Sequence, residues 1–426
     1  MTNTTNHIWH PFTQMQLADA PIHISHGKDA LLFDTDGNEY IDAISSWWVN
    51  IHGHANEAIA KAIAEQALQL EQVIFAGFIH TPAIQLSERI IQLLNNHFSK
   101  VFFSDNGSTA VEVAVKMALQ YWHNKGVTGK TKILALENGY HGDTFGAMSV
   151  GGRSAFNAPF ENHLFETIYI PTPTADNIDD CLKMIADAAK TGTVAGFIFE
   201  PLIQGSGGMI MYEPEHLEAM IREAKSHDII CIADEVMTGF GRTGKLFAID
   251  YIDTKPDIIC LSKGLTGGFM PMGLTVCTED IYNAFLSDDR KKTLFHGHSY
   301  TANPLACAAA LASIKLVNHD RKSDIIAIKL SHANFIHEIK DHPAIKDVRH
   351  RGTILAIEFK TPEDTSYFNS FRDRAYKYYI SRGVLLRPLG NVVYIMPPYC
   401  ITIEQLDKVY SVLKQSLTDL TTHTAQ

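Results

Sequence analysis

Seven short apolar runs between residues 100 and 280 constrain the fold of this chain more than any other feature. They read VFFS, KILAL, TIYI, AGFIFE, IICIADEV, DIICLS and GLTVC, and segments with helical periodicity separate them. Continuous apolar runs are typical of strands buried on both faces, and strands that alternate with helices form parallel sheets. The sequence therefore predicts an α/β fold with a large, mostly parallel sheet wrapped by helices.

The two ends of the chain follow a different pattern. In ALLFDTDGNEYIDAI, an Asp36-Gly37 turn separates two alternating runs, which predicts a β-hairpin. After Pro304 a long helical pattern leads to the strand-like segments VRHRGTILAIEF and VLLRPLGNVVYIMPP. These segments predict a smaller α+β domain built from both termini. We expect its parts at residues 1–50 and 317–426, on either side of a large domain at residues 51–316.

Composition excludes several classes of protein. With 426 residues, of which 46% are hydrophobic and 19% charged, the chain can form two to three globular units. A net charge of −11 argues against a nucleic-acid partner. The first residues are polar and no run of about 18 apolar residues occurs, so we expect no membrane contact and a cytoplasmic location. Six dispersed cysteines without a CxxC pair predict reduced core thiols.

An aspartate and a lysine end two of the apolar runs. Asp234 closes IICIAD, Lys263 follows DIICLS, and both open glycine-rich loops. Singly, such an aspartate usually caps a turn and such a lysine is usually solvated. Parallel strands end at the same edge of a sheet, so we expect the two side chains to meet. Together they suit pyridoxal 5′-phosphate, because a buried carboxylate keeps the pyridine nitrogen protonated and a desolvated amine carries the cofactor and moves protons.

A third element offers a place for a phosphate. Residues 101–122 read as a strand, a tight turn and a helix, with Asn106, Gly107, Ser108 and Thr109 at the helix start. Free backbone N–H groups and the positive end of the helix dipole favour an anion there. Ordinary capping of the helix by Ser108 is the alternative interpretation.

Three segments resemble the class III, fold-type I aminotransferases: DEVMTGFGRTG, SKGLTGG and NGYHGDTFGAMSVGG. Within that class, WHPFTQM, SSWWVNIHGH, HGHSYTANPLACAAA and RPLGNVVYIMPPY resemble the branch that serves biotin synthesis, and the similarity runs from about residue 7 to about residue 415. The resemblance implies a homodimer with shared active sites that binds pyridoxal 5′-phosphate. It also implies transfer of an amino group from S-adenosylmethionine to 8-amino-7-oxononanoate, which gives 7,8-diaminononanoate.

The resemblance further implies roles for individual residues. Beside the catalytic Lys263, the cofactor would contact Asp234, the stacked ring of Tyr140, the phosphate-binding Gly107 and Ser108, and Ser299 and Tyr300 of the partner subunit. Arg387 would pair with the carboxylate of the acceptor. The other candidates for substrate binding are Trp47 and Trp48, which would wall the pocket, with Tyr140, Gly297, Arg242 and Phe12.

Two departures from the family pattern keep alternatives open. Met237 stands where many class III enzymes place a glutamine, which argues against the ornithine and 4-aminobutyrate branches. Phe12 replaces a tyrosine of many adenosylmethionine-using synthases, so lysine stays open as the amino donor, as does another ω-amino acid aminotransferase. A nucleotide-binding dehydrogenase and a silent cofactor-binding protein are more distant alternatives, the first because no G-x-G-x-x-G follows the first strand.

Two His-Gly-His triplets could suggest a metal. They place His52 with His54 and His296 with His298. No cluster of carboxylate or cysteine ligands accompanies either pair, so we expect no metal site.

Overall fold

The computed structural model describes residues 7–420, except for the side chains of residues 318–320. Its centre is a seven-stranded sheet in the order β4-β12-β11-β10-β7-β5-β6. The strands are β4 (Lys100–Ser104), β12 (Gly273–Cys277), β11 (Ile258–Leu261), β10 (Ile230–Asp234), β7 (Val194–Phe199), β5 (Lys132–Leu136) and β6 (Thr167–Ile170). β12 pairs antiparallel with β4 and with β11, and the other neighbouring strands of the sheet pair in parallel. All seven predicted runs are strands, and the predicted mostly parallel sheet is confirmed.

Alternating side chains of this sheet enter two separate cores. In β10, Ile230 and Ile232 join one hydrophobic cluster, whereas Cys231 and Ala233 join the other. The helix α4 (Gly107–Asn124) covers the first of these faces and packs against β4, β12, β11, β10 and β7. Successive strand residues point to opposite faces, so a strand covered on both sides must be apolar throughout. Burial of each large aliphatic side chain contributes roughly 1.5–3 kcal/mol.

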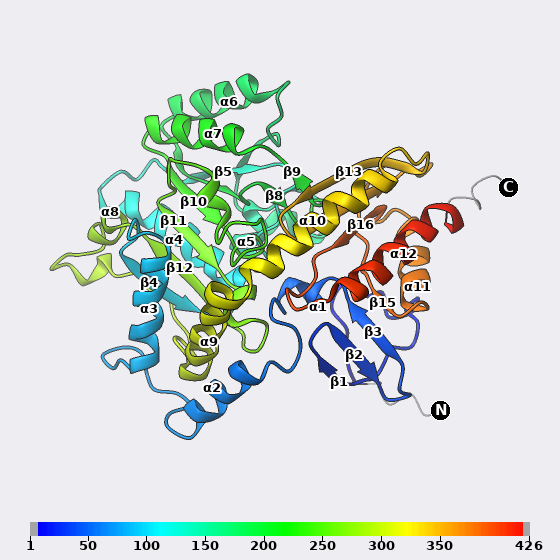
Figure 1. The fold of residues 1–426 in the computed structure, drawn as a ribbon. Coiled ribbons are helices and arrows are strands. Elements are labelled where there is room, and N and C mark those ends of the chain that lie inside the picture. Colours follow the sequence, from blue (N-terminus) through cyan, green and yellow to red (C-terminus); the bar gives the residue numbers. More distant parts are fainter. Residues whose placement is uncertain (1–6, 421–426) are drawn as a thin grey trace.

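Further helices of different lengths and two short strands lie around the large sheet (Figure 1). The longer helices are α2 (Glu57–Ala67), α3 (Thr81–Leu93), α6 (Ile178–Lys190), α7 (Pro214–Ser226) and α9 (Pro304–Asp320). The shorter elements are α5 (Phe145–Val150), α8 (Glu279–Asn283), η1 (Ala158–His163), η2 (Ala248–Tyr251), η3 (Lys263–Thr266), η4 (Arg290–Lys292), β8 (Ile203–Gln204) and β9 (Ile210–Met211). The predicted helix after residue 304 is confirmed, and it begins where the Asn303 side chain accepts a hydrogen bond from the Ala306 N–H at 3.0 Å.

Segments from the two ends of the chain share a second sheet. Its order is β1-β2-β3-β15, with β1 (Ile24–Lys28), β2 (Leu31–Asp34), β3 (Glu39–Asp42) and β15 (Val384–Leu385). The predicted hairpin is β2 and β3, and β15 pairs with β3 in parallel. Figure 1 shows these strands beside α11 (Phe371–Ile380) and α12 (Ile403–Asp419). A smaller unit built from both termini is therefore present. The exact boundaries after residues 50 and 316 stay predictions, and residues 1–6 and 421–426 lie outside the described residues.

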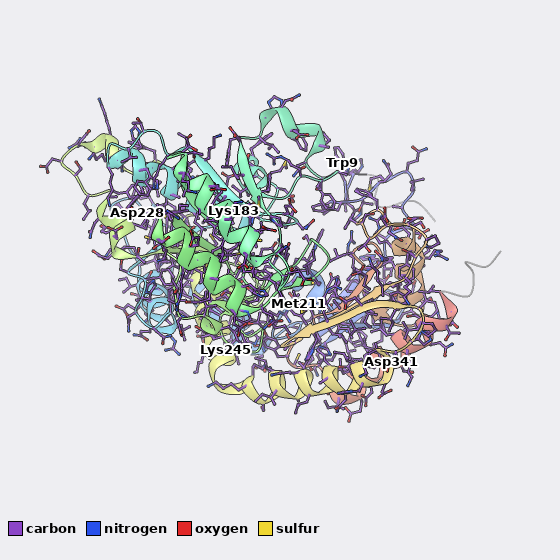
Figure 2. All side chains as sticks on the ribbon, turned by 90° about the horizontal axis from the view of Figure 1, so that it is seen from above. Trp9, Lys183, Met211, Asp228, Lys245 and Asp341 are labelled. Atoms are coloured by element: carbon purple, nitrogen blue, oxygen red, sulfur yellow. The ribbon has the colours of Figure 1, made fainter. Side chains whose placement is uncertain are left out.

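A three-stranded antiparallel sheet follows in the C-terminal half. It contains β13 (Ile345–Arg351), β14 (Ile354–Phe359) and β16 (Val392–Ile395). The long helix α10 (Lys322–Ile339) crosses the middle of the view in Figure 1, from the region of α9 toward β13, and Figure 2 shows it along one side of the molecule. No helix within residues 7–420 is long and apolar enough to cross a membrane. All six cysteines are free, and five are buried as predicted, whereas Cys400 is partly exposed.

Candidate active site

Three charged side chains gather where the central parallel strands end. Asp234 is the last residue of β10, and Lys263 follows the end of β11, the strand paired with β10 in parallel. Glu200 directly follows β7, which pairs with β10 on its other side. We call Glu200, Asp234 and Lys263 the lysine edge. The strands that carry Asp234 and Lys263 thus end at the same edge of the sheet, as expected.

The Lys263 amine is buried and has no partner for a hydrogen bond or ion pair among the described residues. Its Nζ lies 4.5 Å from the centroid of the Trp48 ring, and no hydrogen bond or ion pair to it is found among residues 7–420. Desolvation lowers the pKa of Lys263 to about 8, although the charges of Asp234 and Glu200 oppose this shift. Its backbone has a φ of 44°, a left-handed conformation that costs roughly 1–2 kcal/mol for a residue with a Cβ. The site therefore holds a lysine amine that can lose its proton near neutral pH.

Asp234 is fixed by a histidine that the sequence reasoning missed. The Asp234 Oδ2 atom lies 2.7 Å from Nδ1 of His141, and both side chains are buried. Burial works against protonation of His141, but the hydrogen bond and charge of Asp234 outweigh it and raise the pKa of the imidazole. The Val236 N–H donates to Oδ1 of the same carboxylate at 3.1 Å. These contacts fix the orientation of the Asp234 carboxylate.

Glu200, which was not predicted from the sequence, accepts hydrogen bonds from two loops at the lysine edge. Its Oε1 accepts the Tyr140 N–H and its Oε2 accepts the Gly205 N–H, each at 2.9 Å. Burial raises the pKa of Glu200 to about 7, with His141 opposing and Asp234 adding to the shift. A signal did exist in the sequence, because Glu200 ends the run AGFIFE in the same way that Asp234 ends IICIAD.

The start of α4 leaves backbone donors free for an anion. Asn106 caps the helix, since its side chain accepts the Thr109 N–H at 2.9 Å, so the alternative of capping by Ser108 is wrong. The Ser108 hydroxyl instead lies 2.8 Å from that of Thr144. No described hydrogen bond uses the N–H groups of Gly107 and Ser108. A Cβ added at Gly107 would lie 2.6 Å from a Val236 methyl group, so only glycine fits here.

These residues fit pyridoxal 5′-phosphate on the geometry alone. An unpartnered amine, a buried carboxylate and a helix start with free N–H groups match the aldehyde, the ring nitrogen and the phosphate of that cofactor. The Tyr140 ring is partly buried, and its hydroxyl donates to Asp143 Oδ2 at 2.9 Å. Burial raises the pKa of Tyr140, so the phenol stays neutral and its ring is available for stacking.

The tryptophan pair lies on a strained turn. In α1 (Ser45–Trp48), the φ angles of Ser45, Ser46 and Trp48 are 51°, 58° and 69°. Left-handed non-glycine residues cost roughly 1–3 kcal/mol each and cluster at functional sites. The buried Asp42 carboxylate holds the turn by accepting the Ser46 N–H at 2.8 Å. As a result Trp48 points inward and donates to the Tyr394 hydroxyl at 2.8 Å, whereas Trp47 is 43% exposed.

Phe12, Trp47 and Arg387 meet beside this turn. The rings of Phe12 and Trp47 have centroids 5.6 Å apart, and the guanidinium carbon of Arg387 lies 5.3 Å from the Trp47 ring. Arg387 is partly exposed, and none of the described residues forms a hydrogen bond or ion pair with its guanidinium. A guanidinium in this state can bind the carboxylate of a ligand.

Arg242 differs from Arg387 because it is completely enclosed. It is 1% exposed, donates from Nη1 to the Pro397 carbonyl at 2.7 Å, and lies 5.2 Å from the Tyr399 ring. A longer contact of 3.4 Å joins Nη2 to the carbonyl of Trp48. This geometry suits a residue that orders loops around the site more than one that contacts a substrate.

No described hydrogen bond joins Gly297, Ser299 or Tyr300 to the lysine edge of their own chain. They belong to the exposed segment between η4 and α9, and Tyr300 is 68% exposed. The Ser299 carbonyl accepts from Gln72 at 2.8 Å, and no described hydrogen bond joins Ser299 or Tyr300 to residues 105–109.

The paired histidines have ordinary partners. His52 Nε2 lies 3.0 Å from the Ser313 hydroxyl, and burial lowers its pKa to about 3. His54 Nε2 lies 2.9 Å from Asp42 Oδ2. Within residues 7–420 no group of three or more His, Cys, Asp or Glu side chains is placed to hold a metal ion.

Met237 is buried against the turn at Gly205. A Cβ added at Gly205 would lie 2.5 Å from the Met237 sulfur.

Comparison with known proteins agrees with this geometry. Residues 14–417 match the family described as "Aminotransferase class-III". The adenosylmethionine-8-amino-7-oxononanoate aminotransferases of Synechococcus elongatus and Geobacter sulfurreducens are 47% and 40% identical, and each alignment covers 97% of this chain and at least 96% of the relative. The crystal structure of the Methanocaldococcus jannaschii enzyme of that name superposes with a TM-score of 0.90 at 36% identity, over 96% of this chain and 97% of the other.

A PLP-bound amine transaminase from an uncultivated Pseudomonas species superposes with a TM-score of 0.91 at 28% identity, over 97% of this chain and 99% of the other. The family match spans nearly the whole length, and the strand-end lysine and aspartate lie within it. The chain belongs to the class-III aminotransferase family.

Proposed function

We propose that this protein transfers an amino group from S-adenosylmethionine to 8-amino-7-oxononanoate and so makes 7,8-diaminononanoate for biotin synthesis. The unpartnered Lys263 amine beside Asp234 is the observation that carries the reaction class. The choice of substrates rests on relatives of 35–47% identity over nearly full length that bear this name.

Pyridoxal 5′-phosphate is the proposed cofactor, and when bound it supplies an electron sink for the carbon that loses a proton. Lys263 would carry it, Asp234 would face its ring nitrogen, and Tyr140 would stack on its ring. Gly107 and Ser108 would hold its phosphate through their free N–H groups.

Lys263 then has a second task, which is to move a proton at the carbon that bears the amino group. A pKa of about 8 places this amine close to neutral pH, where a group can both accept and return a proton. The adjacent Trp48 ring excludes water from one side of the amine and is held by its hydrogen bond to Tyr394.

Arg387 is the proposed partner of the acceptor carboxylate. Its guanidinium is unpaired among the described residues and lies over Trp47, which limits the directions that it can take. For the donor, the faces of Trp47 and Phe12 attract a cation, so they suit the sulfonium of S-adenosylmethionine. Lysine is the alternative donor, because Phe12 lacks a hydroxyl.

We further propose a homodimer in which Ser299 and Tyr300 complete the cofactor site of the other subunit. Their loop is exposed and carries large apolar side chains, with Phe295 71% and Tyr300 68% exposed, and Phe78 and Ile79 are exposed to a similar degree. Exposed apolar surface of this kind is typical of an interface. Sedimentation of the wild type and of Phe295→Asp tests this proposal, since the charge should favour monomers and lower cofactor affinity.

The substrates can be tested directly. The purified protein with pyridoxal 5′-phosphate is incubated with 8-amino-7-oxononanoate and one amine at a time, and mass spectrometry detects 7,8-diaminononanoate. We expect product with S-adenosylmethionine. Product with lysine alone would reverse the donor assignment, and no product with any amine would reject the proposed acceptor.

A further inference from the structure

Aromatic side chains from four distant segments meet next to Arg387. Ring centroids are 5.6 Å apart for Phe12 and Trp47, 5.9 Å for Phe12 and Phe156, and 4.7 Å for Phe156 and Tyr367. Phe368 adds a further ring, 6.0 Å from Phe156. We call Phe12, Trp47, Phe156 and Tyr367 the aromatic wall. The last two positions carry no role in the proposed transfer.

The rings of the aromatic wall leave faces uncovered by one another. Its successive interplanar angles are 67°, 87° and 71°, so each contact is edge to face. Phe12 and Trp47 are each 43% exposed, and Phe156 and Tyr367 are partly exposed. An edge-to-face chain with exposed members can accept another flat ring by stacking.

The loop that carries Tyr367 is firmly attached to the segment that carries Arg387. Asn369 is 2% exposed, and its amide donates to the Thr361 hydroxyl at 2.8 Å. Gly390, with a φ of 64°, packs so closely against the Ser366 carbonyl that no side chain fits at position 390. The Asn391 amide also donates to the Thr365 hydroxyl at 3.3 Å, which joins the two segments a second time. The Tyr367 ring is therefore fixed near the pocket and does not belong to an independent surface loop.

The two proposed substrates differ in one feature that affects binding to the aromatic wall, which is the presence of a flat ring. S-adenosylmethionine carries a flat purine, whereas 8-amino-7-oxononanoate and lysine are flexible aliphatic chains. Stacking on aromatic side chains stabilises a flat ring more than a flexible aliphatic chain. Trp47 begins the wall and directly precedes Trp48, whose ring lies 4.5 Å from the Lys263 amine, so the wall extends away from the residue that contacts the reacting amine.

We infer that Phe156 and Tyr367 determine donor specificity by stacking on the purine ring of the amino donor. This inference rests on the proposed function, whose donor is S-adenosylmethionine. It assigns two new residues to the site and explains how an enzyme without a hydroxyl at position 12 selects that donor.

The test uses 5′-methylthioadenosine, which has the purine and sulfur but no amino group to transfer. Calorimetry on the cofactor-loaded enzyme gives its Kd for the wild type, Phe156→Ala, Tyr367→Ala and Tyr367→Phe. Loss of one stacked ring should raise Kd about 5- to 100-fold in the two alanine variants. Tyr367→Phe keeps the ring and should bind like the wild type.

Steady-state kinetics provide the second readout. The KM for S-adenosylmethionine should rise in the alanine variants, while kcat and the KM for 8-amino-7-oxononanoate stay unchanged. Phe160→Ala is the matched control, because it removes a 40% exposed ring from η1, outside the aromatic wall. Unchanged Kd in both alanine variants, no binding of the probe to the wild type, or equal losses for donor and acceptor would each overturn the inference.

The two proposals fail in different ways. A wild type that binds the probe but makes no 7,8-diaminononanoate rejects the proposed function and leaves the purine site standing. A wild type that makes the product, with variants that bind the probe normally, rejects the purine site alone.

Discussion

The lysine edge and the aromatic wall adjoin each other but are built in opposite ways. Glu200, Asp234 and Lys263 each follow a strand of one sheet, so the pairing of β7, β10 and β11 fixes their spacing. Phe12, Trp47, Phe156 and Tyr367 come from turns and loops spread over more than 350 residues. Their positions depend on strained backbone, such as the left-handed Ser45, Ser46 and Trp48. The proposed chemistry thus lies at the ends of paired strands, whereas the proposed substrate selection lies on loops, which vary more readily in sequence.

The largest effect should come from the lysine edge. Lys263→Ala removes both the bond to the cofactor and the proton carrier, so we expect a loss of turnover of about 10⁴-fold or more. Cofactor affinity, measured by equilibrium dialysis, should fall much less. Lys245→Ala is the matched control, since Lys245 is an exposed lysine, labelled in Figure 2. Substantial turnover in Lys263→Ala would place the reacting amine elsewhere.

Asp234→Asn should rank second. An amide of the same shape keeps a hydrogen bond but cannot stabilise a cationic ring nitrogen, so we expect turnover to fall about 10²- to 10³-fold. Circular dichroism should show an unchanged fold. A rate close to that of the wild type would mean that another residue faces the ring nitrogen.

Arg387→Ala tests the other region. Binding of 8-amino-7-oxononanoate should weaken by about 2 kcal/mol, or roughly 30-fold, because a partly exposed charge pair is worth less than a buried one. The KM of acceptor and donor are compared in the variant and in Arg382→Ala, which removes an exposed arginine from the same part of the chain. Equal losses for both substrates would show that one arginine serves both.

A change of pH should alter the contribution of the lysine edge to stability, because Glu200 and Lys263 both have shifted pKa values. The pKa of Glu200 is raised from 4.5 to about 7, so the folded protein keeps this proton where the unfolded chain has lost it. Glu200 therefore lowers the free energy of unfolding as pH rises from about 4.5 to about 7, by about 1–3 kcal/mol. The pKa of Lys263 is lowered from 10.5 to about 8, so the unfolded chain holds this proton at a pH where the folded protein has lost it. Lys263 therefore raises the free energy of unfolding as pH rises from about 8 to about 10.5.

Urea unfolding of the wild type and of Glu200→Gln between pH 4.5 and 7 measures this contribution. The variant should show a flatter dependence on pH, whereas the exposed Glu65→Gln should behave like the wild type. Identical slopes in all three proteins would remove Glu200 from the titrating groups.

The smallest expected effect belongs to Phe12. Phe12→Tyr adds a hydroxyl that can donate one hydrogen bond, worth about 0.5–1.5 kcal/mol if the donor accepts it. Rapid mixing of the enzyme with S-adenosylmethionine or lysine follows the bleaching of the cofactor by each amine. A gain for S-adenosylmethionine alone would support its assignment, and a large gain for lysine would contradict it.

The same contrast explains what could be predicted from the sequence. The seven apolar runs identify the sheet because two-faced burial forbids polar residues in them, and their order places Asp234 beside Lys263. The antiparallel direction of β12 has no comparable signal, since its residues are buried on both faces like those of its neighbours.

Contacts between loops that are distant in the sequence could not be predicted from the pattern of apolar residues. His141 is 93 residues from its partner Asp234, and neither the burial of its ring nor its hydrogen bond has a periodic pattern. The same holds for Phe156 and Tyr367, whose contact depends on the path of two loops. Arg242 and Arg387 look alike in sequence, and only the fold shows that the first is enclosed and the second is available.

Lys263, which follows the end of β11, is the proposed carrier of the cofactor. Borohydride reduction of the protein with bound pyridoxal 5′-phosphate, followed by peptide mapping, tests it most directly. We expect a single modified peptide that contains SKGLTGG, with the label on Lys263. A label on another lysine, or no label on a protein that has taken up the cofactor, would contradict it.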